Sequence, residues 1–172
     1  MDLERFSFDA PPGELLDGVY LVRAPHRYFH QRFRSELGRT LEAQLPAGWE
    51  LNSGMAVRLG DRDQPEPDLT VCFPGVATTP DTTYFRPEHI ALAVEIVSPE
   101  SGDRDREVKP RKFAQAGIAH YWRIEEDNGK PVVYAYELDR DLGRYTPVAV
   151  ERERLKLDRP YPLEIELGKL YP

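Results

Sequence analysis

The sequence has almost no cysteine: Cys72 is the only one in 172 residues. A lone cysteine excludes an internal disulfide and a cysteine-rich zinc site. Cys72 lies in the apolar stretch Leu-Thr-Val-Cys-Phe, where nothing nearby in sequence would activate a thiol. We therefore interpret it as a small buried side chain rather than a nucleophile.

Long hydrophobic runs are also absent. No apolar stretch approaches the roughly 20 residues that a membrane-spanning helix needs, and the first ten residues are acidic and polar, unlike a secretory signal. We therefore expect a cytoplasmic protein with no membrane partner. With 40% hydrophobic and 31% charged residues over 172 positions, the composition predicts a single globular domain that covers residues 1–172.

Positive charge is in deficit overall. The net charge of −7 argues mildly against broad electrostatic binding to nucleic acid. The basic residues are unevenly placed, however: residues 23–41 hold five basic side chains against one acidic one, and residues 104–123 hold six against two. These two basic segments could hold a polyanion, while a solvated helix face explains either one equally well.

The clearest helix signal lies in residues 26–48. Apolar side chains recur there at every fourth position and form one stripe: Phe29, Phe33, Leu37, Leu41 and Leu45. Pro46 and Gly48 should end this helix. A second helix is expected from about residue 105 to residue 116, with Gly117 after its end and Pro110 in its first turn or at a kink.

Short β-type segments fill most of the remaining chain. Residues 90–98 form a near-continuous apolar run, which is typical of a strand covered on both faces. Residues 8–18 are interpreted as a proline-rich entry segment. Other strands are expected at residues 18–25, 48–52, 55–59, 68–73, 118–125, 131–138, 143–150 and 161–167. The order of elements predicts an α/β or α+β fold with one mixed sheet.

One residue of the apolar run, Glu95, does not fit a purely structural strand. A buried carboxylate is unfavourable unless something pairs with it. Asp68 opens another apolar strand, and if the two strands pair side by side, both carboxylates can converge at one end of the sheet. Two nearby carboxylates repel each other, and a divalent cation relieves that repulsion. Oxygen ligands of this kind suit Mg²⁺ or Mn²⁺.

A lysine follows at a suitable distance. Lys109 comes 14 residues after Glu95, on the second expected helix, which can return over the same end of the sheet. Carboxylates, a divalent cation and a lysine together are suited to phosphodiester hydrolysis, because the cation activates water and the lysine stabilises developing charge. Each residue also has a plainer interpretation: Asp68 as a turn residue, Glu95 in a structural ion pair, and Lys109 as a solvated helix lysine.

Three segments, taken together, resemble a known family. "PEPDLTV", "LAVEIVSPES" and "DREVKPRKFAQAGIAHYW" resemble the bacterial Uma-two family, a branch of the PD-(D/E)XK nuclease superfamily, and the resemblance extends over nearly the whole chain. It implies an α/β fold with a restriction-endonuclease-like core, in which helices flank a central mixed β-sheet.

The resemblance also implies roles for individual residues. Asp68 and Glu95 would be metal ligands, and the backbone carbonyl of Ile96 would be a third. The superfamily pattern expects a lysine where this chain has Val97. As in the Uma-two family, that position is apolar, so Lys109 on the following helix would supply the positive charge.

Three further residues are candidates for the same site as Asp68, Glu95 and Lys109. Lys112 is a rival to Lys109 for the role of active-site lysine. Asp105 matches an acidic helix position of the family and, four residues before Lys109, should lie on the same helix face. His30 also matches a family position; we favour a structural histidine over a phosphate contact.

The resemblance therefore implies a metal-dependent nuclease that hydrolyses phosphodiester bonds, with Mg²⁺ or Mn²⁺ as cofactor and DNA as the expected substrate of an endonuclease. A domain of this size would need a pair to cut both strands of a duplex, so a homodimer is expected. The alternative is a catalytically silent protein that keeps the nuclease fold for nucleic-acid binding or assembly, because fold carries over further than function.

Overall fold

The computed structural model describes residues 11–99 and 101–171. The first ten residues, on which the expectation about a secretory signal rests, lie outside the described residues. The elements, in chain order, are β1 Gly13–Leu16, β2 Val19–Val22, α1 Tyr28–Glu42, β3 Glu50–Ser53, β4 Ala56–Val57, β5 Leu69–Cys72, β6 Tyr84–Phe85, a 3₁₀ turn Pro87–His89, β7 Ile90–Ile96, a π-helical turn Arg104–Val108, α2 Lys109–Gln115, β8 His120–Asp127, β9 Lys130–Asp139, β10 Arg144–Glu151, β11 Arg154–Leu157, β12 Leu163–Glu166 and α3 Leu167–Leu170.

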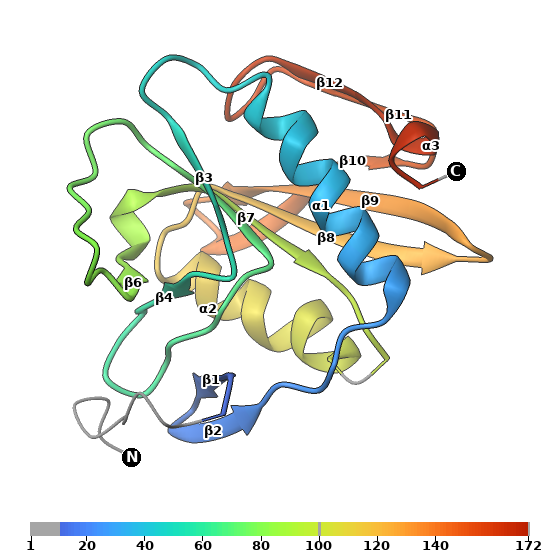
Figure 1. The fold of residues 1–172 in the computed structure, drawn as a ribbon. Helices are drawn as coiled ribbons and strands as arrows, with labels where there is room; N and C mark the ends of the chain where they lie inside the picture. The colour runs from blue at the N-terminus through green and yellow to red at the C-terminus, as the bar shows by residue number, and fades with distance from the viewer. Residues whose placement is uncertain (1–10, 100, 172) are drawn as a thin grey trace.

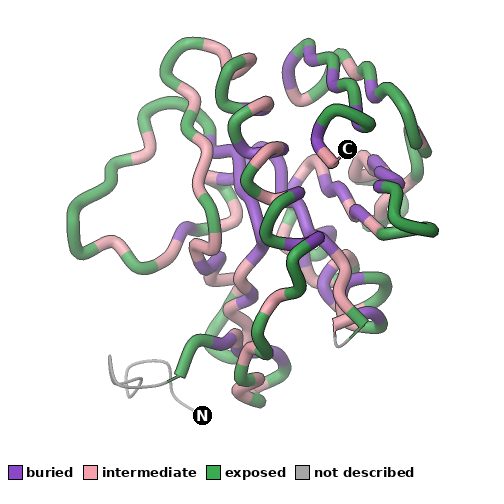
Figure 2. Tube along the Cα trace, turned by 45° about the vertical axis from the view of Figure 1, so that its right-hand side comes forward, coloured by how far each residue is buried: buried purple, intermediate pink, exposed green. Residues whose placement is uncertain are grey.

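Six strands form one mixed sheet in the order β10-β9-β8-β7-β5-β3. The pair β7–β8 is parallel and the other neighbouring pairs are antiparallel. Parallel neighbours need a crossover connection, and α2 supplies it (Figure 1). The apolar run in β7 is explained by this position, since all seven of its residues are buried in the middle of the sheet (Figure 2). The predicted α/β fold with a central mixed sheet flanked by helices is confirmed.

Helix α1 covers one face of the sheet. Its predicted stripe is buried as expected for Phe29, Phe33, Leu37 and Leu41, which belong to one core cluster with residues of β12 and α3. The helix ends at Glu42, four residues before the proline that should have stopped it. Beyond that end, the Gln44 side chain instead accepts a hydrogen bond from the backbone N–H of Glu164 and donates one to its carbonyl.

Helix α2 lies against the opposite face (Figure 1). Phe113 of α2 packs with Ala93 of β7 and Tyr121 of β8 in a second core cluster. Pro110 lies in the first turn of α2, as predicted, and Gly117 after its end adopts the positive φ of 83° that glycine tolerates. No helix in the described part of the chain has the length and apolarity to cross a membrane.

Within the segment interpreted as a proline-rich entry, whose residues 8–10 lie outside the described part of the chain, residues 13–16 form a strand that pairs with the strand predicted at residues 18–25. Strands β1 and β2 pair around Asp17 and Gly18, which both have positive φ, the geometry of a tight Asp-Gly hairpin turn. Backbone hydrogen bonds join Leu15 to Gln64 in both directions. The hairpin is thereby attached to the loop that leads into β5, close to the end of the sheet where Asp68 lies.

We predict that Phe33→Ala lowers the free energy of unfolding by about 3–5 kcal/mol, because a fully buried ring is replaced by a cavity between α1 and the sheet. Urea unfolding followed by tryptophan fluorescence measures this. Ser35→Ala, on the exposed side of the same helix, should stay within about 0.5 kcal/mol of wild type. Equal effects of the two substitutions would contradict this packing.

Candidate functional site

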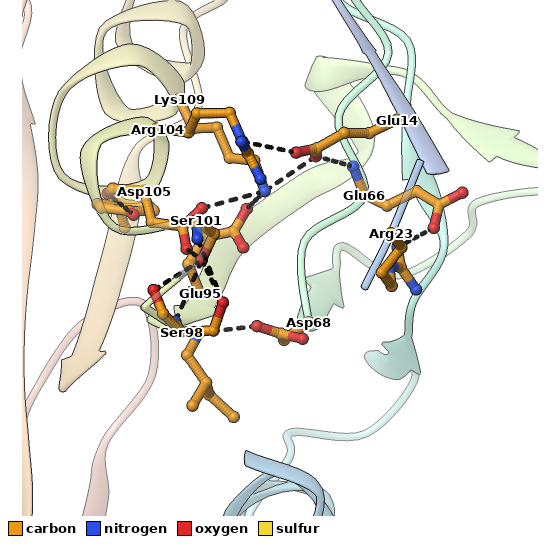
Figure 3. Close-up of polar contacts among 12 residues, drawn as sticks. Glu14, Arg23, Glu66, Asp68, Glu95, Ser98, Ser101, Arg104, Asp105 and Lys109 are labelled. Carbon is orange, nitrogen blue, oxygen red and sulfur yellow. Dashed lines mark hydrogen bonds and ion pairs between the residues drawn. The ribbon is translucent and has the colours of Figure 1, made fainter. Parts of the chain in front are cut away.

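The two predicted carboxylates lie at the same end of the sheet. Strands β5 and β7 are antiparallel neighbours, and Leu69 pairs with Val94. Asp68, the residue just before β5, therefore lies opposite Glu95 of β7. Asp68 Oδ2 accepts a hydrogen bond of 2.7 Å from the backbone N–H of Ile96. Both carboxylates line one small cavity (Figure 3).

This cavity, which we call the acidic cavity, has a volume of about 70 Å³. It can therefore hold a few water molecules or a hydrated cation, but no nucleotide. Its ionisable lining comes from the β1–β2 hairpin, the start of α1, the two inner strands and the π-helical turn: Glu14, Arg23, His26, His30, Glu66, Asp68, Glu95, Arg104, Asp105 and Lys109.

Lys109 lies at the centre of the charged groups. Its side chain is 5% exposed, and Nζ lies 2.9 Å from Glu14, 3.0 Å from Glu95 and 3.3 Å from Asp105 (Figure 3). The contact with Asp105 is the one that the four-residue helix spacing predicts. Three carboxylates from β1, β7 and the π-helical turn thus surround one ammonium group.

The rival lysine has different neighbours. Lys112 Nζ lies 2.6 Å from Asp17 and 2.8 Å from Asp63, so it fastens the β1–β2 turn and the loop before β5 to α2. Since Lys112 pairs with the hairpin and its supporting loop, Lys109 is the lysine that the structure brings to Glu95.

Negative charge exceeds positive charge around Lys109. Burial raises the pKa of Glu95 well above its usual value; Lys109 opposes this shift, while Asp105 and Asp68 add to it. Burial likewise raises the pKa of Asp105, against the effect of Lys109. For Lys109, the neighbouring carboxylates outweigh burial and hold its pKa well above the ordinary value. The ammonium therefore stays charged while the carboxyl groups favour uptake of a proton or a cation.

The pKa of Asp68 is shifted in the opposite direction, below its usual value. Burial alone would raise its pKa, but the hydrogen bonds from His30 and Ile96 and the charge of Lys109 outweigh burial and lower it. His30 Nε2 lies 3.0 Å from Asp68 Oδ1. Asp68 is thus an ionised carboxylate, and each of its oxygens keeps a second lone pair for another ligand.

Two histidines extend this group of potential ligands. One ligand atom from each of His26, His30 and Asp68 lies within 4.8 Å of the others. The rings of His26 and His30 are stacked at 3.9 Å, and His26 Nε2 and His30 Nδ1 are buried without a hydrogen-bond partner among the described residues. Buried polar atoms without partners, beside carboxylates in excess, fit a site for a divalent cation.

Sequence reasoning missed three residues that line the acidic cavity, namely Glu14, His26 and Ser101. Glu14 lies in the segment interpreted as a proline-rich entry, and nothing local shows its contact with a lysine 95 positions away. His26 could have been found, because His26 and His30 are four residues apart at the start of a helix, the spacing that places two side chains on one face. Ser101 was also overlooked; its hydroxyl donates a hydrogen bond to Asp105.

Most basic side chains of the two basic segments are paired with acidic groups of the same chain. Several of their residues form ion pairs with acidic side chains: Arg23 with Glu66, Arg39 with Glu36, Arg104 with Glu14, and Arg106 with Glu125. The positive charge that these two basic segments leave available for a polyanion is therefore smaller than their residue count indicates.

A mixed sheet with helices on both faces, and an acidic cluster with a lysine at the end of its inner strands, is the arrangement that the restriction-endonuclease-like fold implied. The model of the Uma2 (Uma-two) family, described as "Putative restriction endonuclease", matches residues 3–168. The match covers nearly all of the 172 residues, so this chain belongs to the Uma2 family.

A solved structure supports the fold. The crystal structure described as that of a putative nuclease belonging to DUF820 from Anabaena variabilis superposes with a TM-score of 0.71. The two chains are 14% identical, and the superposition covers 99% of this chain and 97% of the other. At this identity the likeness concerns the fold alone. No curated protein matches the chain.

The raised pKa of Glu95 predicts how stability depends on pH without divalent cations. Folded Glu95 keeps its proton to a higher pH than unfolded Glu95, so the folded state binds more protons and its stability falls as pH rises above about 4.5. In EDTA, raising the pH from 6 to 8 should therefore destabilise wild type relative to Glu95→Gln, by at most about 1.4 kcal/mol per pH unit. Urea unfolding at the two pH values measures the difference.

Glu125→Gln is the matched control, because the hydrogen bond from Arg106 lowers the pKa of Glu125. A group of this kind adds stability that is lost only as pH falls below its unfolded pKa. The effect of Glu125→Gln should hence be equal at pH 6 and pH 8. Parallel pH curves for wild type and Glu95→Gln would show that Glu95 is ionised without metal.

Proposed function

We propose that this protein is a metal-dependent nuclease that hydrolyses phosphodiester bonds of nucleic acid, built as one domain over residues 1–172. The observation that carries the proposal is the buried cluster of Glu14, Glu95 and Asp105 around Lys109, beside ionised Asp68, in a chain of the Uma2 family. A cluster that serves stability alone would balance its charges, since an uncompensated buried charge is strongly destabilising.

The ligands that we propose for a divalent cation are the side chains of Asp68 and Glu95 and the backbone carbonyl of Ile96, all in the lining of the acidic cavity. Oxygen ligands suit Mg²⁺ and Mn²⁺. When bound, such a cation would polarise the phosphate and lower the pKa of a water molecule. His26 and His30 add nitrogen ligands beside Asp68, and imidazole suits transition metals, so we expect Mn²⁺ to be accepted at least as well as Mg²⁺.

Lys109 would stabilise negative charge on the phosphate. Its ammonium group is fully surrounded by carboxylates, so a phosphate oxygen has to take the place of one of them. Glu14 is the most exposed of the three, with 11% of its side chain accessible against 3% for Glu95 and 2% for Asp105. Because Glu14 lies on the β1–β2 hairpin, movement of that hairpin would open the cluster to substrate.

The catalytically silent alternative has an observation in its favour. Lys109 is already paired, and the acidic cavity of about 70 Å³ holds no nucleotide. A nuclease fold kept for binding or assembly would need neither an open cavity nor a free ammonium group. DNA as the substrate, a homodimer and a cytoplasmic location stay predictions from the sequence.

We predict that the purified protein cleaves nucleic acid in Mg²⁺ or Mn²⁺ and not in EDTA. Plasmid DNA, single-stranded DNA and RNA should be assayed in parallel. Glu95→Gln removes a proposed ligand, and Lys109→Met removes the proposed stabilising charge, so each should lower the rate by roughly 10²-fold or more. Lys156→Met is the matched control, because this exposed lysine lies in β11, outside the lining of the acidic cavity, and its rate should stay within about threefold of wild type.

Each variant is checked by its melting temperature, because loss of Lys109 leaves buried carboxylates without their counter-charge. Wild type that cleaves none of the three substrates in either metal would favour the silent alternative. Cleavage that is equal in wild type and folded Glu95→Gln would exclude this site as its source.

A further inference from the structure

A second pocket lies on the face of the sheet that α2 covers. It has a volume of about 250 Å³ and lies between α2, the strands β8 and β9, and the start of β10. Four guanidinium groups line it, those of Arg106, Arg111, Arg123 and Arg144, together with three tyrosines. Among the described residues no carboxylate lines it. We call it the arginine–tyrosine pocket.

The arginines give the pocket a positive charge that the protein does not neutralise. Arg106 and Arg123 share one partner, Glu125, at 2.6 and 2.8 Å. The guanidinium groups of Arg111 and Arg144 form no ion pair or hydrogen bond with any residue in the ranges 11–99 and 101–171. In a protein with a net charge of −7, such a local excess indicates an anionic ligand. Guanidinium groups match the geometry of phosphate with paired hydrogen bonds.

The tyrosines give the pocket an aromatic wall. Tyr121 and Tyr145 are stacked with ring centroids 5.6 Å apart, and Tyr136 lies 6.0 Å from Tyr121. The hydroxyl groups of Tyr121 and Tyr145 donate to the backbone carbonyls of Asp105 and Ile118. Burial raises the pKa of Tyr136 and Tyr145, so the wall is uncharged. Aromatic faces beside arginines are what binds single-stranded nucleic acid, through base stacking and phosphate contacts.

A third pocket connects this surface with the acidic cavity. Its volume is about 170 Å³, it shares His30 and Ser98 with the acidic cavity, and it shares Arg106 with the arginine–tyrosine pocket. The third pocket therefore shares lining residues with both of the others and lies next to each of them. Since the acidic cavity has no room for a nucleotide, a strand with its phosphate at that cavity has to lie along neighbouring surfaces such as these.

We propose that the arginine–tyrosine pocket binds one nucleotide unit of an unpaired nucleic-acid strand, with its phosphate between Arg111 and Arg144 and its base against the half-buried ring of Tyr136. The identity of the ligand as nucleic acid rests on the proposed nuclease function. A base can stack on a side chain only when it is not stacked in a duplex, so the substrate class is a single strand or a locally opened duplex.

The test is binding of a 5′-fluorescein-labelled oligothymidylate of 12 nucleotides, followed by fluorescence anisotropy in EDTA at low salt, so that no cleavage is needed. Arg111→Gln with Arg144→Gln should weaken binding at least tenfold. The salt dependence should also become shallower, by about 0.7 in the slope of log K against log salt for each lost phosphate contact.

Arg154→Gln with Lys169→Gln is the matched control. It changes the net charge equally, but these exposed residues lie in β11 and α3, which pack with α1 on the other face of the sheet. Its affinity should stay within threefold of wild type. Tyr136→Phe should bind like wild type, whereas Tyr136→Leu should bind at least threefold more weakly because the stacking surface is lost.

A nucleotide unit within a strand and a free nucleotide present the same phosphate and base to this pocket. Competition with thymidine 5′-monophosphate distinguishes between these two ligands. Weak competition at millimolar concentration supports a unit within a strand, while competition as strong as that of unlabelled oligonucleotide supports a free nucleotide in the same pocket. The proposal is overturned if wild type binds no oligonucleotide, if the control pair loses as much affinity as the arginine pair, or if Tyr136→Leu has no effect. Arginine-dependent binding without cleavage in any metal would contradict only the proposed nuclease function.

Discussion

The buried contact between Lys109 and its carboxylates is the interaction on which this end of the molecule depends. One ammonium group joins Glu14 of the β1–β2 hairpin, Glu95 of the central strand and Asp105 of the turn before α2. Val19 and Val22 of the hairpin are exposed, whereas Leu15 and Leu16 are buried, so its position depends on apolar packing together with polar contacts such as those of Lys112. Removing the ammonium would affect three elements at once.

The same cluster connects stability with chemistry. A buried ion pair contributes little net stability, because desolvation of the charges offsets their attraction, and three carboxylates around one ammonium are less favourable still. Such an arrangement is understandable where a cation completes it, as we propose for Asp68 and Glu95. The arginine–tyrosine pocket has the opposite imbalance, because two of its four arginines share Glu125 and, among the described residues, no carboxylate pairs with Arg111 or Arg144. Uncompensated charges of both signs thus lie along one continuous series of pockets.

Features with a local pattern could be predicted from the sequence. The four-residue repeat located α1, the apolar run located β7, and the polar interruption at Glu95 marked the site. Its closeness to Asp68 followed from pairing of the two strands, which the structure confirms. The β1–β2 hairpin was missed although its Asp17-Gly18 turn is a local signal. The contact of Glu14 with Lys109 could not be predicted, because it joins segments 95 residues apart and each segment looks ordinary alone. The internal pairing of most arginines was hidden for the same reason.

In the proposed nuclease site, a divalent cation takes the place of protons among these carboxylates. Calorimetric titration of Mn²⁺ at pH 7, in two buffers with different ionisation enthalpies, tests it most directly, since the heats give both the affinity and the protons released. We expect Mn²⁺ to bind wild type with net proton release, and to bind folded Glu95→Gln at least tenfold more weakly. Equal binding to both proteins without proton release, or no binding to either, would contradict this proposal.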